Sequence, residues 1–347
     1  MRVVLVGLGW VATEVWLPRL LSCPDCTVVG AVEPDAGTAA RAAPLLEGRT
    51  VHADYHDVPL DGMDCAFVLT PNHTHAEIGG WFLEHGRTVV LEKPVCIDRA
   101  QLDALAAAAG AGGGRLALST APRHRGDVAA LRRVVESGEL GAPRVAELSW
   151  VRARGIPRSG WSTQRASSGG GALMDLGWHL IDLVLDLWGP VRVRGAAACM
   201  SDDFIRRDGF GATWRGTDDC PPSGDVEDQL TALVTTDSYA LSMRFAWASH
   251  ESVDETVVTL RGVEGTAELR TTFGFSPRRL DGSALRVKRA GSVRTIEAEP
   301  TDVGSEYDRQ LAALLTRDHD ETTTERSLTT AGGVLDIVNA CYSSAGI

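Results

Sequence analysis

The chain has 347 residues and a net charge of −12, with 44% hydrophobic and 23% charged residues. These values are ordinary for a globular protein, and the length predicts two domains. The negative charge argues against nucleic acid and anionic membrane surfaces as partners, and no apolar run reaches the ~18 residues that a membrane span needs. Seven scattered cysteines, an odd number, are typical of a reducing cytoplasm, where we expect the protein to reside.

A strand–turn–helix pattern at the N-terminus predicts a dinucleotide-binding site. Residues 2–6 form a short β-branched run typical of a buried parallel strand. Gly7-Leu8-Gly9-Trp10-Val11-Ala12 follows, and a helical pattern continues through Leu21. In such a turn the first glycine permits the bend and the second lets the backbone approach a pyrophosphate. The small Ala12 allows the helix to pack closely on the strand.

The second predicted strand, residues 27–32, ends at Glu33, about 20 residues after the glycines. A carboxylate at this position accepts hydrogen bonds from the ribose 2′-OH of NAD and repels the 2′-phosphate of NADP. The following Pro34-Asp35-Ala36 offers no arginine to bind that phosphate. NAD is therefore the predicted cofactor, with NADP as the alternative.

The alternation of strands and helices continues, with strands predicted at 64–69, 87–91 and 115–118 and helices at 75–85 and 100–109. Such a series predicts a doubly wound parallel sheet, whose ligands bind at the carboxyl ends of the strands. Thr70-Pro71-Asn72 and Glu92-Lys93-Pro94 follow two of these strands directly. Both segments are therefore expected at the ligand-binding edge.

Lys93 is notable because only two of the 34 basic residues are lysines, and the other is Lys288. Arginine is locked in its charged form, whereas a lysine that is partly buried can lose its proton. Lys93 is therefore a candidate proton-transfer group, although the compositional bias alone could place a lysine there by chance.

After a predicted helix that runs from Ala129 to about Gly141, the pattern changes to period-two alternation, which predicts a second domain built on an open, mostly antiparallel sheet. The predicted boundaries are 1–121 for the Rossmann domain and 122–347 for an α+β domain that binds substrate. The predicted strands are 144–151, 230–235, 240–247, 256–261, 266–269, 285–289 and 292–296. Because such sheets usually cover their open face with another subunit, a homodimer or homotetramer is expected.

The stretch from Gly169-Gly170-Gly171 to Asp182 contains a helical apolar face. Asp175 and His179 are four residues apart and should project from one side of this helix. A carboxylate beside an imidazole is a proton-transfer arrangement. The alternative is that Asp175 caps the helix and His179 is a core histidine.

Together these motifs resemble the Gfo/Idh/MocA family of glucose–fructose oxidoreductases and inositol dehydrogenases, in family order and over essentially the whole chain. The resemblance implies that Lys93 contacts the reacting oxygen and the nicotinamide ribose, that His179 is the general acid/base, and that Asp175 orients the substrate. Pro71 and Asn72 would line the cofactor groove.

The resemblance further implies that Thr70, His75, Glu92, Trp10 and Val11 belong to the cofactor site. Trp10 would lie over the cofactor, or simply pack its helix. No metal site is predicted, and His75 is interpreted as a groove residue rather than a metal ligand.

Three residues are expected to bind substrate: Arg123, which matches a family arginine, and Arg154 and Trp161, which lie in a segment rich in arginine and tryptophan. This segment also contains Arg152, Arg158 and Arg165. Guanidinium groups suit phosphate or carboxylate and tryptophan faces suit sugar rings, so a phosphorylated or nucleotide-linked sugar is one interpretation. The other is a solvated or subunit-facing loop. The polar segment 201–225, which includes Cys220, is expected to be a lid or a subunit contact.

The predicted function is hydride transfer between the nicotinamide and a secondary alcohol or ketone carbon of a sugar, amino sugar or cyclitol, as a dehydrogenase or ketoreductase. Three alternatives stay open. The chain could reduce a non-sugar substrate such as an imine or dihydrodiol, act as an NAD-using glycosidase, or serve as a non-catalytic dinucleotide sensor.

Overall fold

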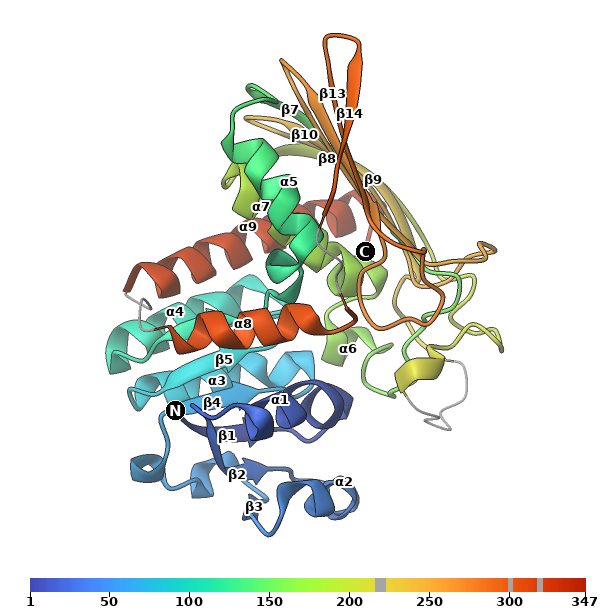
Figure 1. Cartoon of the computed structure of the whole chain (residues 1–347). Helices are drawn as coiled ribbons and strands as arrows, with labels where there is room; N and C mark the ends of the chain where they lie inside the picture. The colour runs from blue at the N-terminus through green and yellow to red at the C-terminus, as the bar shows by residue number, and fades with distance from the viewer. Residues whose placement is uncertain (216–222, 299–301, 317–320) are drawn as a thin grey trace. The chain divides into compact units, whose positions relative to one another are not determined.

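The computed structural model describes residues 1–215, 223–298, 302–316 and 321–347 (Figure 1). The chain divides into two compact units. Unit 1 consists of Met1–Ser119 and Tyr307–Ala331, and unit 2 of Thr120–Glu306 and Gly332–Ile347. The polypeptide therefore leaves unit 1, builds most of unit 2, returns to unit 1 and ends in unit 2.

Unit 1 is built on a six-stranded parallel sheet of order β3-β2-β1-β4-β5-β6. Its strands are β1 (Arg2–Val6), β2 (Thr27–Val32), β3 (Val51–His52), β4 (Cys65–Val68), β5 (Thr88–Leu91) and β6 (Leu116–Leu118). The strand order reverses between β1 and β4, and ligands of such sheets bind at this reversal. The predicted doubly wound sheet is confirmed.

The helices of unit 1 occupy the segments between the strands and part of the returning segment. They are a π-helical turn (Val11–Trp16), α1 (Leu17–Ser22), α2 (Ala36–Ala42), α3 (His75–Glu84), α4 (Arg99–Gly112) and most of α8 (Ser305–Leu315). Short 3-10 turns lie at Ala43–Leu46, Tyr55–Asp57, Leu60–Gly62 and Asn72–Thr74. The long helix α9 (Glu321–Ala345) contributes its first part to unit 1 and its second part to unit 2.

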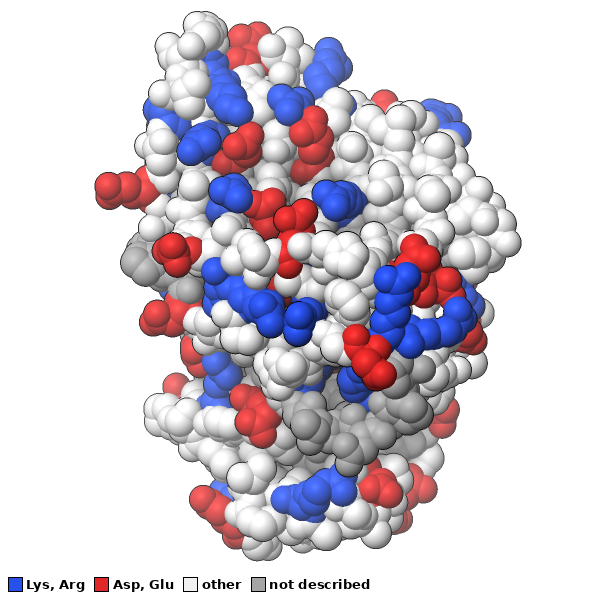
Figure 2. All heavy atoms as spheres, turned by 90° about the vertical axis from the view of Figure 1, so that its right-hand side faces the viewer, with Lys and Arg blue, Asp and Glu red and all other residues white. Residues whose placement is uncertain are grey.

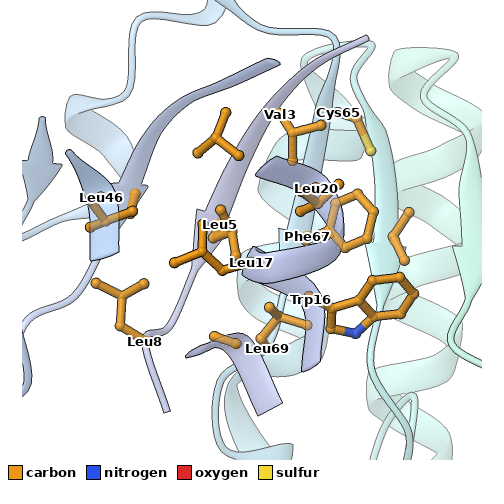
Figure 3. Close-up of a cluster of buried hydrophobic side chains, with 14 of the residues drawn as sticks. Val3, Leu5, Leu8, Trp16, Leu17, Leu20, Leu46, Cys65, Phe67 and Leu69 are labelled. Atoms are coloured by element: carbon orange, nitrogen blue, oxygen red, sulfur yellow. The ribbon is translucent and has the colours of Figure 1, made fainter. Parts of the chain in front are cut away.

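Buried side chains of the first helix fix it against the sheet (Figure 3). Trp16, Leu17 and Leu20 are essentially inaccessible to solvent. The Trp16 ring meets the edge of Phe67 on β4 with ring centroids 5.0 Å apart. Each such side chain contributes about 1.5–3 kcal/mol by burial, so the turn that precedes this helix is held firmly over β1.

Unit 2 contains an eight-stranded sheet of order β14-β13-β12-β11-β7-β10-β9-β8. Its strands are β7 (Pro143–Val151), β8 (Val193–Ser201), β9 (Gln229–Thr236), β10 (Ala240–Ala246), β11 (Glu255–Gly262), β12 (Thr266–Thr271), β13 (Ala284–Arg289) and β14 (Ser292–Ile296). Only the β10–β7 pair is parallel, so the predicted mostly antiparallel sheet is confirmed. The sequence did not predict β8, because its run of small residues shows no alternation of apolar and polar side chains.

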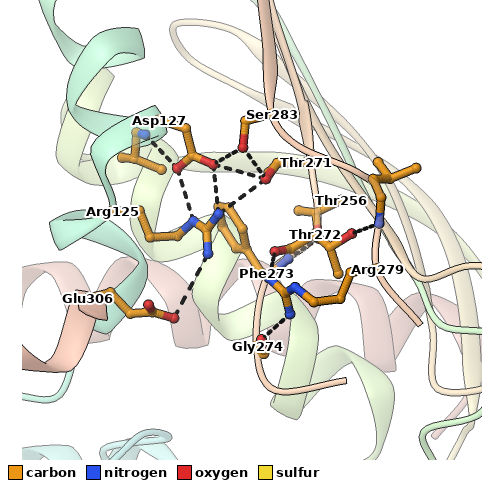
Figure 4. A network of polar contacts seen from close by, with 12 residues as sticks. Arg125, Asp127, Thr256, Thr271, Thr272, Phe273, Gly274, Arg279, Ser283 and Glu306 are labelled. Atoms are coloured by element: carbon orange, nitrogen blue, oxygen red, sulfur yellow. Dashed lines mark hydrogen bonds and ion pairs between the residues drawn. The ribbon is translucent and has the colours of Figure 1, made fainter. Parts of the chain in front are cut away.

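The helical segments of unit 2 are a 3-10 turn (Ala121–His124), α5 (Gly126–Glu136), α6 (Arg165–Ser168), a π-helical turn (Leu173–Gly177), α7 (Trp178–Trp188) and a 3-10 turn (Thr213–Arg215). A buried polar network joins the start of α5 to β12 (Figure 4). Arg125 forms a two-point ion pair with Asp127, and the Asp127 carboxylate accepts bonds from the hydroxyls of Thr271 and Ser283. Because these charges are paired and hydrogen-bonded, their burial is tolerated.

Charged side chains of both signs are interspersed on the face shown in Figure 2. Exposed ion pairs in unit 2 include Arg261 with Glu147 and Lys288 with Glu268. Such pairs contribute at most about 1 kcal/mol each. No helix within the described residues combines the length and hydrophobicity needed to cross a membrane.

Candidate active site

The first turn of unit 1 has the backbone geometry that its glycines permit. Gly7 has φ = +88°, donates its N–H to the Val32 carbonyl at 2.8 Å, and lies against Thr70. A Cβ at residue 7 would come within 2.9 Å of the Thr70 methyl. At Gly9, by contrast, no atom lies within 4 Å of the position that a Cβ would take. The chain itself does not require a glycine there, and the open space leaves room for a ligand.

The helix after this turn begins with a π-helical turn, Val11–Trp16. The amides of Ala12 and Thr13 donate to the Gly9 carbonyl at 3.0 and 3.1 Å. Ala12 is fully buried, as its predicted packing role requires, whereas Trp10 and Val11 are partly exposed. Single π-helical turns are rare and frequent at functional sites.

Glu33 lies directly beside the glycine turn. Its carboxylate accepts the Leu8 amide at 2.9 Å and the Asp35 amide at 3.0 Å, one on each oxygen. A carboxylate oxygen can accept two hydrogen bonds, so both oxygens retain capacity for ribose hydroxyls. The structure therefore fixes the Glu33 carboxylate where the sequence predicts a ribose ligand.

The turn after β4 is held by His75, which is 1% exposed. Its Nδ1 lies 2.7 Å from the Pro94 carbonyl oxygen and its Nε2 lies 2.8 Å from that of Thr70. The ring thus bridges the turns after β4 and β5. Burial lowers the pKa of the imidazole while the two carbonyls oppose that shift. Asn72 is buried between these turns, whereas Pro71 is partly exposed.

Glu92 and Lys93 follow β5. The buried Glu92 carboxylate accepts bonds from the Trp16 indole at 3.0 Å, the Ser119 hydroxyl at 2.7 Å and the Lys93 amide at 3.1 Å. Lys93 itself is partly exposed. The arrangement anchors the backbone that carries Lys93 to the first helix and to the end of β6.

Unit 1 therefore brings the predicted cofactor residues to one edge of its sheet, because β1, β4 and β5 are neighbours. The open space at Gly9, the helix N-terminus and the acceptor capacity of Glu33 fit a dinucleotide. A bound NAD would be held by these groups through its pyrophosphate and ribose.

Asp175 and His179 stand out within unit 2 by their exposure. Between Gly171 and Leu185, every residue is buried except these two, which are partly exposed. Asp175 lies in the π-helical turn Leu173–Gly177, and His179 lies in the first turn of α7. The rest of this apolar stretch packs into the unit, so these two polar side chains are the ones in it that a ligand can reach.

Side chains at the ends of two strands of unit 2, β7 and β10, surround this pair. The indole N–H of Trp247, just after β10, donates to Asp175 Oδ2 at 2.8 Å. The guanidinium of Arg152, just after β7, lies 3.7 Å from the same oxygen. The ring of Trp150 lies beside the His179 ring, with centroids 5.8 Å apart. The sequence did not single out Trp247, because a tryptophan in an alternating strand resembles ordinary core. Trp150 marks the start of the segment rich in arginine and tryptophan but was not among the predicted substrate residues.

The start of the helix that carries Asp175 is held by Glu227. Its buried carboxylate accepts the amides of Gly171 and Leu173 at 3.0–3.1 Å and the Tyr342 hydroxyl at 3.0 Å. A Cβ at Gly171 would lie 1.8 Å from the Glu227 carbonyl oxygen, and one at Gly170 would lie 1.8 Å from the Tyr342 hydroxyl. Sequence analysis missed Glu227 because its partners are more than 50 residues away.

Arg123, predicted to bind substrate, is instead committed to carboxylates of its own unit. It binds Asp182 through two hydrogen bonds, at 2.5 and 2.7 Å, and Asp186 through a third at 2.9 Å. Its side chain is only 16% exposed. This geometry gives a role in substrate binding no support and indicates that Arg123 ties the 3-10 turn Ala121–His124 to α7.

The other two predicted substrate residues, Arg154 and Trp161, are exposed on unit 2. Neither is brought to the Asp175 carboxylate by any contact between described residues. Of the arginine-rich segment it is Arg152 that reaches Asp175. Cys220 and most of the second half of segment 201–225 lie outside the described residues, so the expected lid stays a prediction.

Comparison with known protein families assigns both parts of the chain. Residues 1–119 match the model of the oxidoreductase family with an NAD-binding Rossmann fold. Residues 128–268 match the GFO/IDH/MocA C-terminal domain. The NAD-binding fold predicted from the glycine turn is thereby confirmed.

Curated relatives point the same way. The chain is 41% identical, over 99% of its length and 96% of the relative's, to the "Putative UDP-kanosamine synthase oxidoreductase subunit" of Amycolatopsis mediterranei (strain S699). It is 29% identical to the D-glucoside 3-dehydrogenase of Escherichia coli (strain K12), over 57% of each chain. Among solved structures, the WlbA dehydrogenase from Bordetella pertussis, in complex with NADH and UDP-GlcNAcA, has a TM-score of 0.75 at 20% identity. The match covers 100% of this chain and 97% of that one.

Proposed function

The chain belongs to the GFO/IDH/MocA oxidoreductase family, and we propose that it is an NAD-dependent dehydrogenase acting on a secondary hydroxyl of a nucleotide-linked sugar. The observation that carries this proposal is the partial exposure of Asp175 and His179 within the otherwise buried stretch Gly171–Leu185. Partial exposure leaves both side chains within reach of a ligand. A proton-transfer pair of this kind is what oxidation of an alcohol requires.

The proposed chemistry divides between cofactor and protein. When bound, the nicotinamide accepts or gives a hydride at C4. His179 takes the hydroxyl proton as the carbinol becomes a carbonyl, and returns it in the reverse direction. Lys93 donates a hydrogen bond to the same oxygen, which stabilises the negative charge that develops on it. Asp175 orients the substrate and the imidazole.

The substrate class follows from the relatives. One is named for UDP-kanosamine synthesis and another as a D-glucoside 3-dehydrogenase, and both names refer to glucose-type rings. We therefore propose UDP-glucose as the first substrate to test, with oxidation at carbon 3. The resulting ketone is what an amination step would need, so the product would feed amino-sugar formation.

Location, assembly and cofactor choice complete the proposal. We place the enzyme in the cytoplasm, as a homodimer or homotetramer formed through the eight-stranded sheet. We propose NAD as the preferred cofactor because Glu33 is fixed beside the glycine turn, where it would repel the 2′-phosphate of NADP.

The test is to mix the purified protein with UDP-glucose and NAD and to measure the formation of NADH by its nicotinamide absorbance. We expect Lys93→Met and His179→Gln each to lower turnover roughly a thousandfold while NADH still binds. Lys288→Met is the matched control, because this second lysine is an exposed partner of Glu268, and its turnover should be unchanged.

Other outcomes select the other functions. Activity with imines or dihydrodiols but not with sugars would assign a non-sugar reductase. Tight NADH binding without turnover of either substrate class, and unaffected by Lys93→Met, would leave the dinucleotide sensor. Release of a glycosyl group without net reduction of NAD would assign an NAD-using glycosidase.

A further inference from the structure

Arg152 is a buried cation with unused hydrogen-bonding capacity. It follows β7 and is 5% exposed. Its Nε and Nη1 have no hydrogen-bond partner among the residues that the structure describes. Burying a guanidinium without hydrogen bonds is costly. An arginine kept in this state is expected to obtain its bonds from a ligand.

The surroundings hold the Arg152 guanidinium in place without satisfying it. Its Cζ lies 5.0 Å from the ring centroid of Trp150 and 5.5 Å from that of Trp214. Its Nη1 lies 3.7 Å from Asp175 Oδ2, which exceeds hydrogen-bonding distance. Aromatic faces attract a cation but accept no strong hydrogen bond. Nε and Nη1 are therefore buried beside the carboxylate without hydrogen bonds among the described residues.

The position of Arg152 relates it to the catalytic pair of unit 2. Its backbone continues the strand that presents Trp150 to His179, and its side chain faces Asp175. Within the stretch Gly171–Leu185, Asp175 and His179 are the two partly exposed residues. A ring whose reacting hydroxyl meets His179 would thus present another hydroxyl to Asp175 and Arg152.

The carboxylates near Arg152 favour a neutral ligand over a phosphate. The nearby carboxylates, Asp175 and Asp254, oppose the fall in the pKa of Arg152 that burial causes, whereas Arg215 adds to it. A phosphate on the guanidinium would lie within about 4 Å of the Asp175 carboxylate and be repelled by it. A neutral hydroxyl suits both groups, because it accepts from the arginine and donates to the carboxylate.

We propose that Arg152 and Asp175 together bind a hydroxyl next to the reacting carbon, so that the enzyme requires a vicinal diol. This inference rests on the proposed sugar dehydrogenase function and deepens it. Trp150 supplies an apolar face on which the ring can lie. Arg152 belongs to the segment for which a phosphate or carboxylate was one interpretation of the sequence, and the proposal assigns it to recognition of the sugar ring instead.

The test compares Arg152→Met with the unaltered enzyme on UDP-glucose and on its 2-deoxy and 4-deoxy analogues. We expect the variant to lower kcat/KM for UDP-glucose roughly 10- to 100-fold. For the analogue that lacks the bound hydroxyl, the loss should be less than about threefold, because no bond remains to be removed. Arg286→Met, at an exposed position on β13, is the control and should change neither value.

The Tm of Arg152→Met distinguishes a role of Arg152 in substrate recognition from a structural role. If Arg152 serves substrate, methionine removes an unsatisfied buried charge and the Tm should stay equal or rise. A lower Tm together with equal losses on all three substrates would overturn the proposal.

A protein that does not oxidise UDP-glucose would defeat the proposed function by itself. In that case the shift in Tm caused by glucose or myo-inositol with NADH tests the inference. A Tm shift that is present in the unaltered protein and absent in Arg152→Met supports the inference. Any other pattern of Tm shifts overturns the inference.

Discussion

Two glycine clusters mark the two units, and they exist for different physical reasons. In unit 1 the second glycine of the turn, Gly9, faces open space, since a Cβ there would meet no atom within 4 Å. In unit 2 a Cβ at Gly170 or Gly171 would collide with Tyr342 or Glu227 at 1.8 Å. The first cluster leaves room for a ligand, and the second leaves room for the protein itself.

The difference shows that a glycine motif does not by itself identify a binding site. Gly9 costs conformational entropy with no packing gain in return, so its use must lie in what binds there. Gly171 allows the backbone to approach Glu227 closely enough for that carboxylate to hold the start of the helix carrying Asp175. We propose that Gly9 acts through the ligand and Gly171 through the placement of Asp175.

The largest effect is expected for Gly171→Ala. The added methyl would overlap the Glu227 carbonyl oxygen, which belongs to the backbone and cannot move aside as a side chain could. We expect a loss of about 3 kcal/mol in the free energy of unfolding, measured by urea denaturation. Gly110→Ala in α4 is the matched control, because its Cβ would enter open space; it should stabilise by up to about 1 kcal/mol. Equal stability of both variants would remove the packing explanation.

Gly9→Ala should show the opposite behaviour. Stability should change by less than about 0.5 kcal/mol, since nothing in the chain opposes the methyl. The methyl would instead occupy the space through which the pyrophosphate approaches the backbone, and we expect the Kd for NADH to rise at least about tenfold, or ~1.4 kcal/mol. Fluorescence titration of tryptophan-to-nicotinamide energy transfer measures it. Unchanged NADH affinity would mean that the turn does not contact the cofactor.

The contrast between the two units also explains which parts of the structure the sequence could predict. The cofactor half was predictable because its signals are local: Gly7, Gly9 and Glu33 lie within one βαβ unit, and neighbouring parallel strands end at one edge. The mixed sheet of unit 2 was predictable from alternation. The return of residues 307–331 to unit 1 was not part of the prediction, because no local pattern states which sheet a distant helix will cover.

In unit 2 the roles of individual side chains depend on contacts between residues that are distant in sequence. Arg123, Arg152 and Arg154 are chemically identical in sequence, yet one is paired with aspartates, one is buried beside Asp175 and one is exposed. Burial and partners, which decide the role of a guanidinium, are set by tertiary structure. Glu227 was missed for the same reason.

Glu227→Gln tests the electrostatic side of the second cluster. Burial raises the pKa of the Glu227 carboxyl in the folded protein. The native state therefore binds this proton more tightly than the unfolded chain does. The resulting stability is complete below the unfolded pKa of about 4.3 and is lost as pH rises through the raised folded pKa.

Glutamine is neutral at every pH, so the variant should lose less stability than the unaltered protein as the pH rises from about 4 through the raised folded pKa. Urea denaturation at several pH values gives the free energy of unfolding of both proteins. In the difference between the two curves, the contributions of other buried acids such as Glu306 cancel. Parallel curves for the two proteins would contradict a raised pKa for Glu227. NADH affinity should not change, because Glu227 belongs to unit 2.

Glu33→Gln is the counterpart at the first cluster and should have the smallest effect. The amide oxygen can still accept the Leu8 amide that Glu33 now binds, so stability should change little. The lost charge weakens the bond to the ribose of NAD and removes the repulsion of the NADP phosphate. We expect the preference for NADH over NADPH to narrow about tenfold, or ~1.4 kcal/mol. Titration of both cofactors measures the ratio, and Glu84→Gln at an exposed site on α3 is the control. An unaltered ratio with weaker binding of both would assign Glu33 to supporting the turn rather than to choosing the cofactor.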